Sequence, residues 1–250
     1  MARGRAVVDW AMATALLLAT MGGNAAAGAQ GAGRQAGGQV PRLAAEAEAW
    51  AESAEPSVDG LEQMENGVDC GGTAWSIGRP GLWVTAAHVV TGCGAKPYFL
   101  CPFGTDQGCA PAHVLQVFKQ WDLAFLEVPG MERPPLELYW PGEVPVGTPV
   151  ATLDDRQVTL AGPARVLWGR FVGFQELENL GAFVPAHSYD APTIALTAYA
   201  GMSGSPVFGP GGSVIGLVTD TGDGQTNLVS TASIQGALGP LLLSGAKGYD

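Results

Sequence analysis

The apolar residues that follow position 70 come in short runs bounded by glycine, proline or aspartate. Runs of this length that are rich in Val, Leu, Phe and Thr predict β-strands. They lie at 73–77, 82–86, 113–118, 123–128, 148–153, 164–174, 193–198, 205–208, 213–219 and 227–231. The 37 glycines and 18 prolines exclude a helical bundle, because both residue types break helix interiors. The pattern therefore predicts an all-β protein of the sandwich or barrel class.

A proline-rich stretch at 129–147 divides these strands into two groups. Since proline rarely enters a central strand, we expect this stretch to be a linker between two β units at about 70–128 and 148–232. Residues 233–243 predict a short C-terminal helix despite Gly239 and Pro240.

The N-terminus has the features of a secretory signal peptide. Two early arginines precede an apolar run at 10–21, and the Ala-Gly-Ala at 27–29 offers a cleavage site before Gln30. The run is too short for a membrane anchor, which needs about 20 apolar residues. We therefore predict that residues 1–29 are removed and that the mature protein is secreted or periplasmic, with no membrane segment.

Residues 30–69 differ from the rest of the chain in charge. They hold eight acids and two bases, and the Ala and Glu residues at 42–52 favour a short exposed helix. The segment is interpreted as an acidic propeptide or inhibitory arm, with a solvated tail as the alternative. The functional domain then spans 70–250.

The charge balance also limits the partners. The formal net charge is −11, and a nucleic-acid partner is not expected because phosphate binding needs clustered Lys and Arg. No motif requires a metal or another cofactor, and we expect a monomer. His113 and His187 are interpreted as structural or exposed. Asp154 and Asp155 are assigned to a loop, with a calcium site as the alternative.

All four cysteines, Cys70, Cys93, Cys101 and Cys109, lie within 40 residues of one another. An even count in an exported chain predicts disulfides. Zinc is the alternative, but the chain has no Cys-x-x-Cys pair. Three disulfide connectivities are compatible with these residues.

His88 and Asp122 stand at the ends of two predicted strands. His88 follows Thr-Ala-Ala at 85–87, where an imidazole emerges at a rim and can serve as a general base. Asp122 precedes the strand at 123–128, where a carboxylate must be hydrogen-bonded. A structural histidine and a turn aspartate are the alternatives. Together the two side chains suit a carboxylate that orients an imidazole.

Ser203 lies between Gly201 and Gly204, within Gly-Met-Ser-Gly-Ser-Pro at 201–206. Glycines around a serine permit a tight turn whose backbone N–H groups converge on an anion. A simple Gly/Ser turn is the alternative. The motif is not the Gly-x-Ser-x-Gly elbow of α/β-hydrolases, because position 205 is a serine and no strand–helix alternation surrounds it.

With these motifs in the order His, Asp, Ser, the chain resembles the trypsin/chymotrypsin superfamily of serine proteases. The likeness covers about 70–245 and is closest to the bacterial branch near the glutamyl endopeptidases. It implies an all-β fold of two antiparallel, chymotrypsin-like β-barrels, with His88 and Asp122 in the first barrel and Ser203 in the second.

The resemblance also implies a disulfide pairing. Cys70 and Cys93 resemble the family's disulfide that staples the histidine loop. We therefore choose the sequential pairing, Cys70–Cys93 and Cys101–Cys109.

The mechanism implied by the resemblance is acyl transfer. Ser203 would attack the scissile carbonyl, His88 would take its proton and Asp122 would orient His88. The backbone N–H groups of Gly201 and Ser203 would form the oxyanion hole. Ser205 is a neighbouring serine that we do not assign as nucleophile.

The residues that match the family's specificity pocket are neutral: Thr197, Ala198, Val218 and Thr219. Val218 stands where glutamyl endopeptidases carry a histidine, and Thr197 stands where trypsin-like enzymes carry an aspartate. Neither specificity for Glu nor specificity for Arg and Lys is therefore expected. Met202 replaces the aspartate that pairs with a new N-terminus in animal digestive members, so that activation switch is not expected.

The sequence thus predicts a secreted serine endopeptidase that acts on proteins or peptides. Two alternatives stay open. One is a catalytically silent protease fold that binds a partner, and the other is an esterase that uses the same triad.

Overall fold

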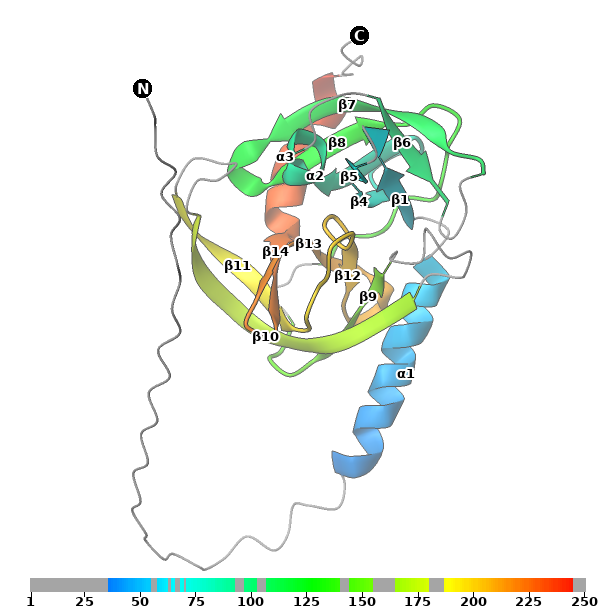
Figure 1. Cartoon of the computed structure of the whole chain (residues 1–250). Coiled ribbons are helices and arrows are strands. Elements are labelled where there is room, and N and C mark those ends of the chain that lie inside the picture. Colours follow the sequence, from blue (N-terminus) through cyan, green and yellow to red (C-terminus); the bar gives the residue numbers. More distant parts are fainter. Residues whose placement is uncertain are drawn as a thin grey trace, which may run out of the picture.

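The computed structural model describes residues 36–54, 58–62, 64–65, 68–69, 71–92, 97–102, 107–139, 144–154, 165–179 and 187–244. The predicted signal peptide at 1–29, Cys70, Cys93 and Asp155 lie outside the described residues. Two β-barrels lie one above the other in Figure 1, and a helix packs beside the lower barrel.

The first barrel closes through six antiparallel strands in the order β1-β4-β5-β8-β7-β6. These are β1 (Val58–Glu62), β4 (Gly72–Ser76), β5 (Leu82–Ala86), β6 (Tyr98–Cys101), β7 (Ala110–Phe118) and β8 (Leu123–Glu127). The short helix α2 (Ala87–Thr91) follows β5, the 3-10 turn η2 (Lys119–Trp121) precedes β8, and β2 (Met64–Glu65) pairs with β3 (Val68–Asp69). Trp75, Trp83 and Phe125 are fully buried and fill this barrel.

The second barrel closes in the order β10-β11-β14-β13-β12-β9. Its strands are β9 (Pro149–Asp154), β10 (Arg165–Asn179), β11 (His187–Ala195), β12 (Pro206–Phe208), β13 (Val214–Gly222) and β14 (Gln225–Ser230). The 3-10 turn η4 (Pro210–Gly212) joins β12 to β13, and the helix α3 (Thr231–Ser244) follows β14. The predicted fold class, two antiparallel barrels with a C-terminal helix, is therefore confirmed.

The structure assigns Val58–Glu62 to the first barrel rather than to the expected arm at 30–69. As β1, this segment pairs with β4 on one side and with β6 on the other, so it closes the barrel. Val58 and Leu61 are fully buried. The sequence conceals this strand because it is short and contains two acids and a glycine, which β-strands disfavour.

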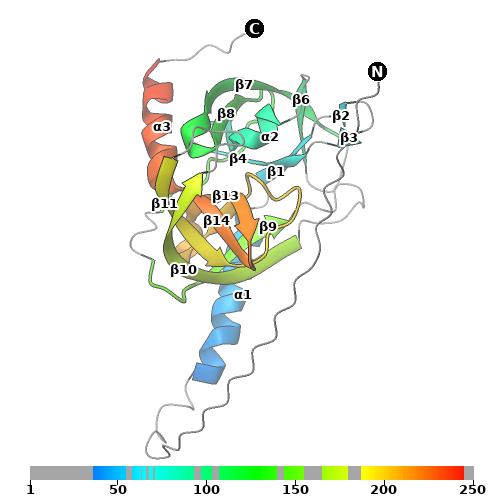
Figure 2. The same ribbon diagram turned by 60° about the vertical axis from the view of Figure 1, so that its left-hand side comes forward.

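The helix α1 (Ala36–Ala54) is also more than the short exposed helix expected at 42–52. Ala47 and Ala51 are fully buried, and the helix lies against β9, β10, β12 and η4 of the second barrel (Figures 1 and 2). The ring of Trp50 lies over Gly212 in η4. Small alanine side chains allow this close approach of helix and sheet.

The chain between β8 and β9 crosses from one barrel to the other. Near the first barrel, the N–H of Leu136 and the carbonyl of Arg133 are hydrogen-bonded to Ser76. Near the second, the N–H of Tyr139 donates to the carbonyl of Val214. The described parts of this proline-rich stretch therefore follow the surfaces of both barrels.

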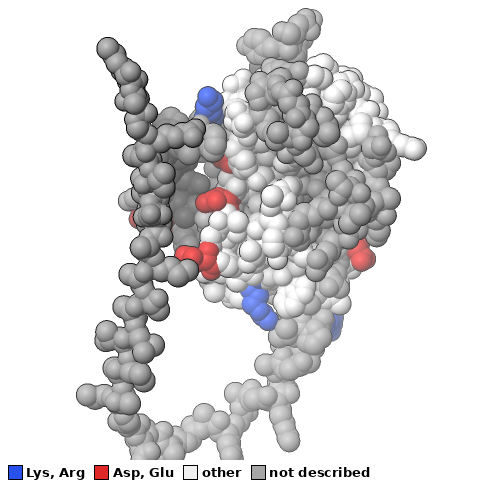
Figure 3. Space-filling view, viewed as in Figure 1, with Lys and Arg blue, Asp and Glu red and all other residues white. Residues whose placement is uncertain are grey.

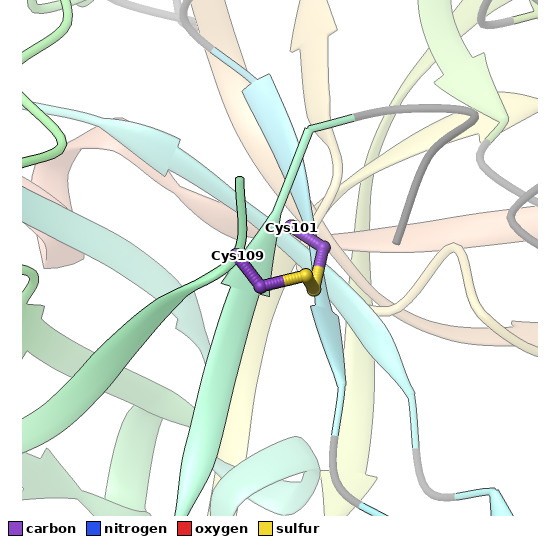
Figure 4. The surroundings of a disulfide bond; sticks show 2 residues. All are labelled: Cys101 and Cys109. Carbon is purple, nitrogen blue, oxygen red and sulfur yellow. A yellow bond between two sulfur atoms is a disulfide. The ribbon is translucent and has the colours of Figure 1, made fainter. Parts of the chain in front are cut away.

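Cys101 and Cys109 form a disulfide that joins the end of β6 to the residue before β7 (Figure 4). This is one of the two bridges of the predicted sequential pairing.

The described surface in Figure 3 is sparsely charged, in agreement with the 14% of charged residues in the chain. Among the described residues, no helix is long and apolar enough to span a membrane.

Candidate active site

His88 lies on the first turn of α2, directly after the end of β5. The preceding Thr85, Ala86 and Ala87 are buried, so the chain is anchored in the barrel up to the residue before the imidazole. The His88 side chain keeps 29% of its surface exposed. The ring is therefore held on a rigid base and is still accessible to a reactant.

Asp122 holds His88 through both oxygens of its carboxylate. Its Oδ2 lies 2.8 Å from Nδ1 of His88, and its Oδ1 accepts the backbone N–H of His88 at 2.8 Å. The backbone carbonyl of Asp122 accepts the N–H of Ala87 at 3.0 Å. A neutral imidazole that donates from Nδ1 to this carboxylate has Nε2 free to accept a proton.

The backbone of Asp122 is itself unusual. With φ of 50°, it occupies the left-handed region, which a non-glycine residue adopts at some cost in free energy. The turn η2 ends here, and β8 begins at the next residue. Such strain is kept where surrounding bonds determine the conformation, and here those bonds aim the carboxylate at His88.

Thr219 makes a contact that the sequence interpretation did not predict. Its hydroxyl donates to Oδ2 of Asp122, the same oxygen that faces His88. Thr219 was expected to line a specificity pocket, but the structure places it on β13 as a hydrogen-bond donor to the carboxylate. No local signal links it to Asp122, because 97 residues separate them.

The turn that contains Ser203 belongs to the second barrel and is hydrogen-bonded to β4 of the first barrel. The backbone N–H of Thr73 on β4 donates to the carbonyl of Ser203 at 2.8 Å, and the Thr73 hydroxyl donates to the carbonyl of Gly201 at 3.0 Å. A Cβ on Gly72 would lie 2.9 Å from the Ser203 carbonyl and 2.7 Å from Val89 on α2. The Ser203 turn and the helix that carries His88 are thus packed against the same point of β4.

Gly204 has no room for a side chain. Its φ is +92°, and a Cβ there would lie 2.0 Å from the carbonyl oxygen of Thr73 and 2.5 Å from the hydroxyl of Thr85. The motif therefore needs glycine after Ser203 both for its backbone conformation and for the contact between the barrels.

The two neighbouring serines differ in environment. Ser205 is fully buried, and its hydroxyl donates to the carbonyl of Leu153 on β9 at 3.1 Å. Ser203 is partly exposed at the tip of the turn. This difference favours Ser203 over Ser205 as a nucleophile.

The backbone N–H groups around Ser203 differ in their hydrogen bonding. The N–H of Met202 donates to the carbonyl of Tyr199, and that of Gly204 donates to Val218. Within the described part of the chain, the N–H groups of Gly201 and Ser203 donate to no protein acceptor. Such N–H groups can stabilise a negatively charged oxygen.

The four residues expected at a specificity pocket lie in different surroundings. Thr197 is exposed, whereas Ala198 is buried beside the turn. Val218 packs in the core of the second barrel, and its N–H donates to the carbonyl of Ser205. Met202 is also fully buried in that core, with an apolar side chain that forms no ion pair.

The remaining candidates lie apart from this site. His113 is exposed on β7. Of the described residues, no three His, Cys, Asp or Glu side chains lie together as a group that could hold a metal ion.

Comparisons with known proteins agree with this fold. A family model described as a trypsin-like peptidase domain matches residues 72–217. Among curated proteins, no sequence matches the chain at a significant level.

Three solved structures of the Rv3671c protease from Mycobacterium tuberculosis share the fold. The active form is 21% identical with a TM-score of 0.67, covering 80% of this chain and 86% of that one. A serine-to-alanine mutant in the inactive form is 24% identical with a TM-score of 0.62, covering 79% and 92%. Another inactive form is 23% identical with a TM-score of 0.64, covering 80% and 95%. Since the family model matches more than half of the length of the present chain, this chain belongs to the trypsin-like peptidase family.

Proposed function

We propose that the protein is an exported serine endopeptidase with the triad Ser203, His88 and Asp122. The observation that carries the proposal is the arrangement of Asp122. Its carboxylate accepts from both the ring and the backbone of His88 and from the hydroxyl of Thr219. A partner-binding protein without catalysis would have no need of such a precisely fixed imidazole.

In the first half of the reaction, Oγ of Ser203 forms a bond to the carbonyl carbon of the scissile peptide while its proton moves to Nε2 of His88. The carbonyl oxygen becomes an oxyanion and accepts hydrogen bonds from the N–H groups of Gly201 and Ser203. Asp122 stabilises the imidazolium. The C–N bond then breaks, the amine leaves with the proton from His88, and an acyl-enzyme remains.

In the second half, water takes the place of the amine. His88 accepts a proton from water as the oxygen bonds to the acyl carbon, and it returns that proton to Ser203 Oγ when the ester bond breaks. The products are a carboxylic acid and the free enzyme, so atoms and charges balance without a cofactor.

Labelling with a fluorophosphonate probe tests the nucleophile. The wild-type protein and Ser205→Ala should be labelled, and Ser203→Ala should not. Ser205→Ala is the matched control because it removes a neighbouring hydroxyl that is buried and bonded to Leu153. Labelling that persists in Ser203→Ala would overturn the site assignment, and a wild-type protein that is never labelled would favour the silent binding fold.

A library of peptides and a set of simple esters separate the endopeptidase from the esterase. The endopeptidase cleaves internal peptide bonds, and the Ser203→Ala variant does not. Turnover of esters with no peptide cleavage would support the esterase instead.

Export is supported by the signal-like sequence at 1–29 and by the disulfide between Cys101 and Cys109, since disulfides are rare in reducing compartments. Sequencing the N-terminus of the protein recovered outside the cytoplasm should find Gln30 as the first residue. An intact Met1 on protein confined to the cytoplasm would contradict export. We also place the chain in the bacterial branch near the glutamyl endopeptidases, on its motifs.

A further inference from the structure

The helix α2, which carries His88, is five residues long, and a helix of that length does not hold its shape alone in water. Its first turn is bonded to Asp122. The backbone carbonyl of Asp122 accepts the N–H of Ala87 at 3.0 Å, and its Oδ1 accepts the N–H of His88 at 2.8 Å. A helix held only at this end could still turn about it, so the orientation of the imidazole also depends on what holds the other end.

The other end of α2 is bonded to Tyr98. The hydroxyl of Tyr98 donates to the backbone carbonyl of Val90 at 2.6 Å, and this bond is buried. The last carbonyls of a helix have no partner within the helix, so they are open to a donor from elsewhere in the fold. Because the bond is buried, water does not readily replace the hydroxyl when it is removed.

Tyr98 itself belongs to a fixed part of the first barrel. Its strand, β6, pairs with β1 on one side and with β7 on the other. Tyr98 lies opposite Ala112 on β7, and both residues are buried. Burial raises the pKa of Tyr98 above its ordinary value of 10.0, so the hydroxyl keeps its proton and can donate at any pH at which a histidine acts as a base.

The side chains of α2 hold the helix against the barrel but do not set its rotation. Val89 and Val90 are buried, and a Cβ on Gly72 of β4 would lie 2.7 Å from Val89. Apolar packing of this kind is non-directional, whereas hydrogen bonds have preferred angles. The bonds to Asp122 at one end and to Tyr98 at the other therefore determine how the helix is turned.

We propose that Tyr98 is a positioning residue for His88, because its hydroxyl holds the end of α2 and thereby keeps Nδ1 of the imidazole facing the Asp122 carboxylate. The inference rests on the proposed function, in which His88 is the general base. Tyr98 acts through the helix and does not touch the reacting atoms. Its loss should therefore change the reaction rate and not the binding of substrate.

The first experiment is Tyr98→Phe, which removes the hydroxyl and preserves the ring. The probe is p-nitrophenyl acetate, since both acylation by this ester and the later hydrolysis pass a proton through His88. A displacement of about 1 Å costs about 10²-fold, and we expect the smaller displacement here to lower kcat by about 10-fold, with KM nearly unchanged. A wild-type kcat, or a rise in KM with kcat unchanged, overturns the inference.

The matched control is Ser76→Ala. Ser76 is a fully buried residue of the same barrel, and its hydroxyl also donates to a backbone carbonyl, that of Arg133, at 3.0 Å. It lies at the end of β4 that leads into the turn before β5, whereas α2 follows the opposite end of β5. Ser76→Ala should lower the urea midpoint of unfolding and leave kcat unchanged. An equal fall of kcat in both variants would mean that general loosening of the barrel is the cause, and would refute the role of Tyr98.

A third variant restores a donor. Replacement of Tyr98 by p-aminophenylalanine places an amino group near the position of the hydroxyl, where it can donate to the carbonyl of Val90. This protein should recover most of the kcat that Tyr98→Phe loses. A kcat that stays at the value of Tyr98→Phe would show that the hydrogen bond is not what matters, and the inference would fail.

Proton NMR follows the imidazole without any turnover. The proton between Nδ1 of His88 and the Asp122 carboxylate lies in a charge-assisted hydrogen bond, so its resonance is found far downfield, and its loss in His88→Ala assigns it. In Tyr98→Phe this resonance should move upfield or disappear through exchange with water, and in Ser76→Ala it should stay in place. An unchanged resonance in Tyr98→Phe contradicts the inference.

The same measurements separate this inference from the proposed function. A wild-type protein that turns over the ester and is labelled by a fluorophosphonate, with Tyr98→Phe unchanged in kcat and in the resonance, refutes only the role of Tyr98. A wild-type protein that shows neither turnover nor labelling refutes the proposed function. The resonance then decides by itself whether Tyr98 orients the imidazole, and a shift in Tyr98→Phe still supports that contact.

Discussion

The two barrels fix their parts of the candidate active site by different physical means. The first barrel holds His88 through hydrogen bonds to Asp122, whose carboxylate accepts from three donors. The second barrel holds Ser203 through a crowded backbone, in which Gly204 fits against β4 only because it has no side chain. Removal of a polar group should therefore disturb the position of His88, and an added side chain at Gly204 should disturb the position of Ser203.

Thr73 shows how the His88 part and the Ser203 part of the site are kept aligned with each other. It belongs to the first barrel, yet both its N–H and its hydroxyl bind backbone carbonyls of the Ser203 turn. Thr219 makes the reverse connection, from the second barrel to Asp122 of the first. Each barrel thus holds a residue of the proposed triad that belongs to the other barrel, so the proposed site needs both barrels to be docked.

Asp122→Asn should have the largest effect. An amide that donates toward Nδ1 of His88 favours the tautomer in which Nε2 carries the proton and cannot accept another. We expect kcat for ester hydrolysis to fall by about 10⁴-fold. Retention of more than a tenth of the activity would contradict the role of Asp122.

The control for that change is Asp223→Asn. Asp223 has the same φ of 50° as Asp122 but lies exposed in the turn between β13 and β14. Asparagine is tolerated in this region of backbone conformation, so the substitution tests the carboxylate alone. The variant should keep activity within about 2-fold of the wild type, since a solvated surface charge contributes little.

Gly204→Ala tests the steric side of the comparison. The added methyl group would lie 2.0 Å from the Thr73 carbonyl, so the turn must move away from β4. We expect a loss of about 10²-fold or more in kcat/KM, because a displacement of about 1 Å is sufficient for this. The free energy of unfolding, measured with urea, should fall by several kcal/mol.

Gly211→Ala separates crowding from backbone strain. Gly211 also has a positive φ, +77°, but a Cβ there would meet nothing within 4 Å. The free energy of unfolding of the Gly211→Ala variant should fall by about 1 kcal/mol through backbone strain alone, and the variant should keep its activity. An equal loss of activity and stability in Gly204→Ala and Gly211→Ala would mean that the contact of Gly204 with β4 is unimportant.

Thr219→Val tests the bond from the second barrel to the first. The substitution removes the hydroxyl that donates to Asp122 and preserves shape. We expect a fall of about 10-fold in kcat with KM nearly unchanged, because a positioning residue acts on the reacting groups and not on substrate binding. Thr219→Ser should restore kcat, and a failure of serine to do so would assign Thr219 a packing role only.

The sequence was sufficient for the fold class and for the motifs at His88, Asp122 and Ser203, because strand periodicity and turn glycines are local signals. It did not reveal β1, whose acids and glycine hide a strand that only closure of the barrel explains. The assignment of Val218 to a specificity pocket stays a prediction, and its side chain packs in the core of the second barrel.

The contact of Thr219 with Asp122 was beyond the sequence for a different reason. It is a hydrogen bond to a residue distant in the chain, and threonine is a common strand residue with no motif around it. Which of many threonines meets a functional group is decided by strand register and by the docking of the barrels. Only the three-dimensional structure contains that information.

Asp59 is a buried acid of the first barrel and, unlike Asp122, has no hydrogen-bond donor at its Oδ2. Substitution of Asp59 should have the smallest effect of the changes considered. Asp59 lies on β1 with 3% of its surface exposed, and Arg133 Nε is 3.8 Å from its Oδ2, too far for a hydrogen bond. Burial raises the pKa of Asp59 from 3.8 to about 7, although the nearby Arg133 opposes this rise. Asp59 is therefore an acid that the fold prefers to keep protonated.

The sign of its pH dependence follows from proton binding. Between about pH 4 and 7 the folded protein holds a proton on Asp59 that the unfolded chain has released, so the contribution of Asp59 to stability falls as pH rises through this range. Asp59→Asn removes the titration, and Arg133, with 36% of its side chain exposed, can be solvated in the variant. Urea unfolding at pH 5, 6 and 8 should show a flatter profile for Asp59→Asn, with a gain on the order of 1–3 kcal/mol at pH 8. If the variant is instead less stable than the wild type at pH 8, the ionised Asp59 is stabilised by Arg133 after all, and the first barrel then holds its inner acid as firmly as it holds Asp122.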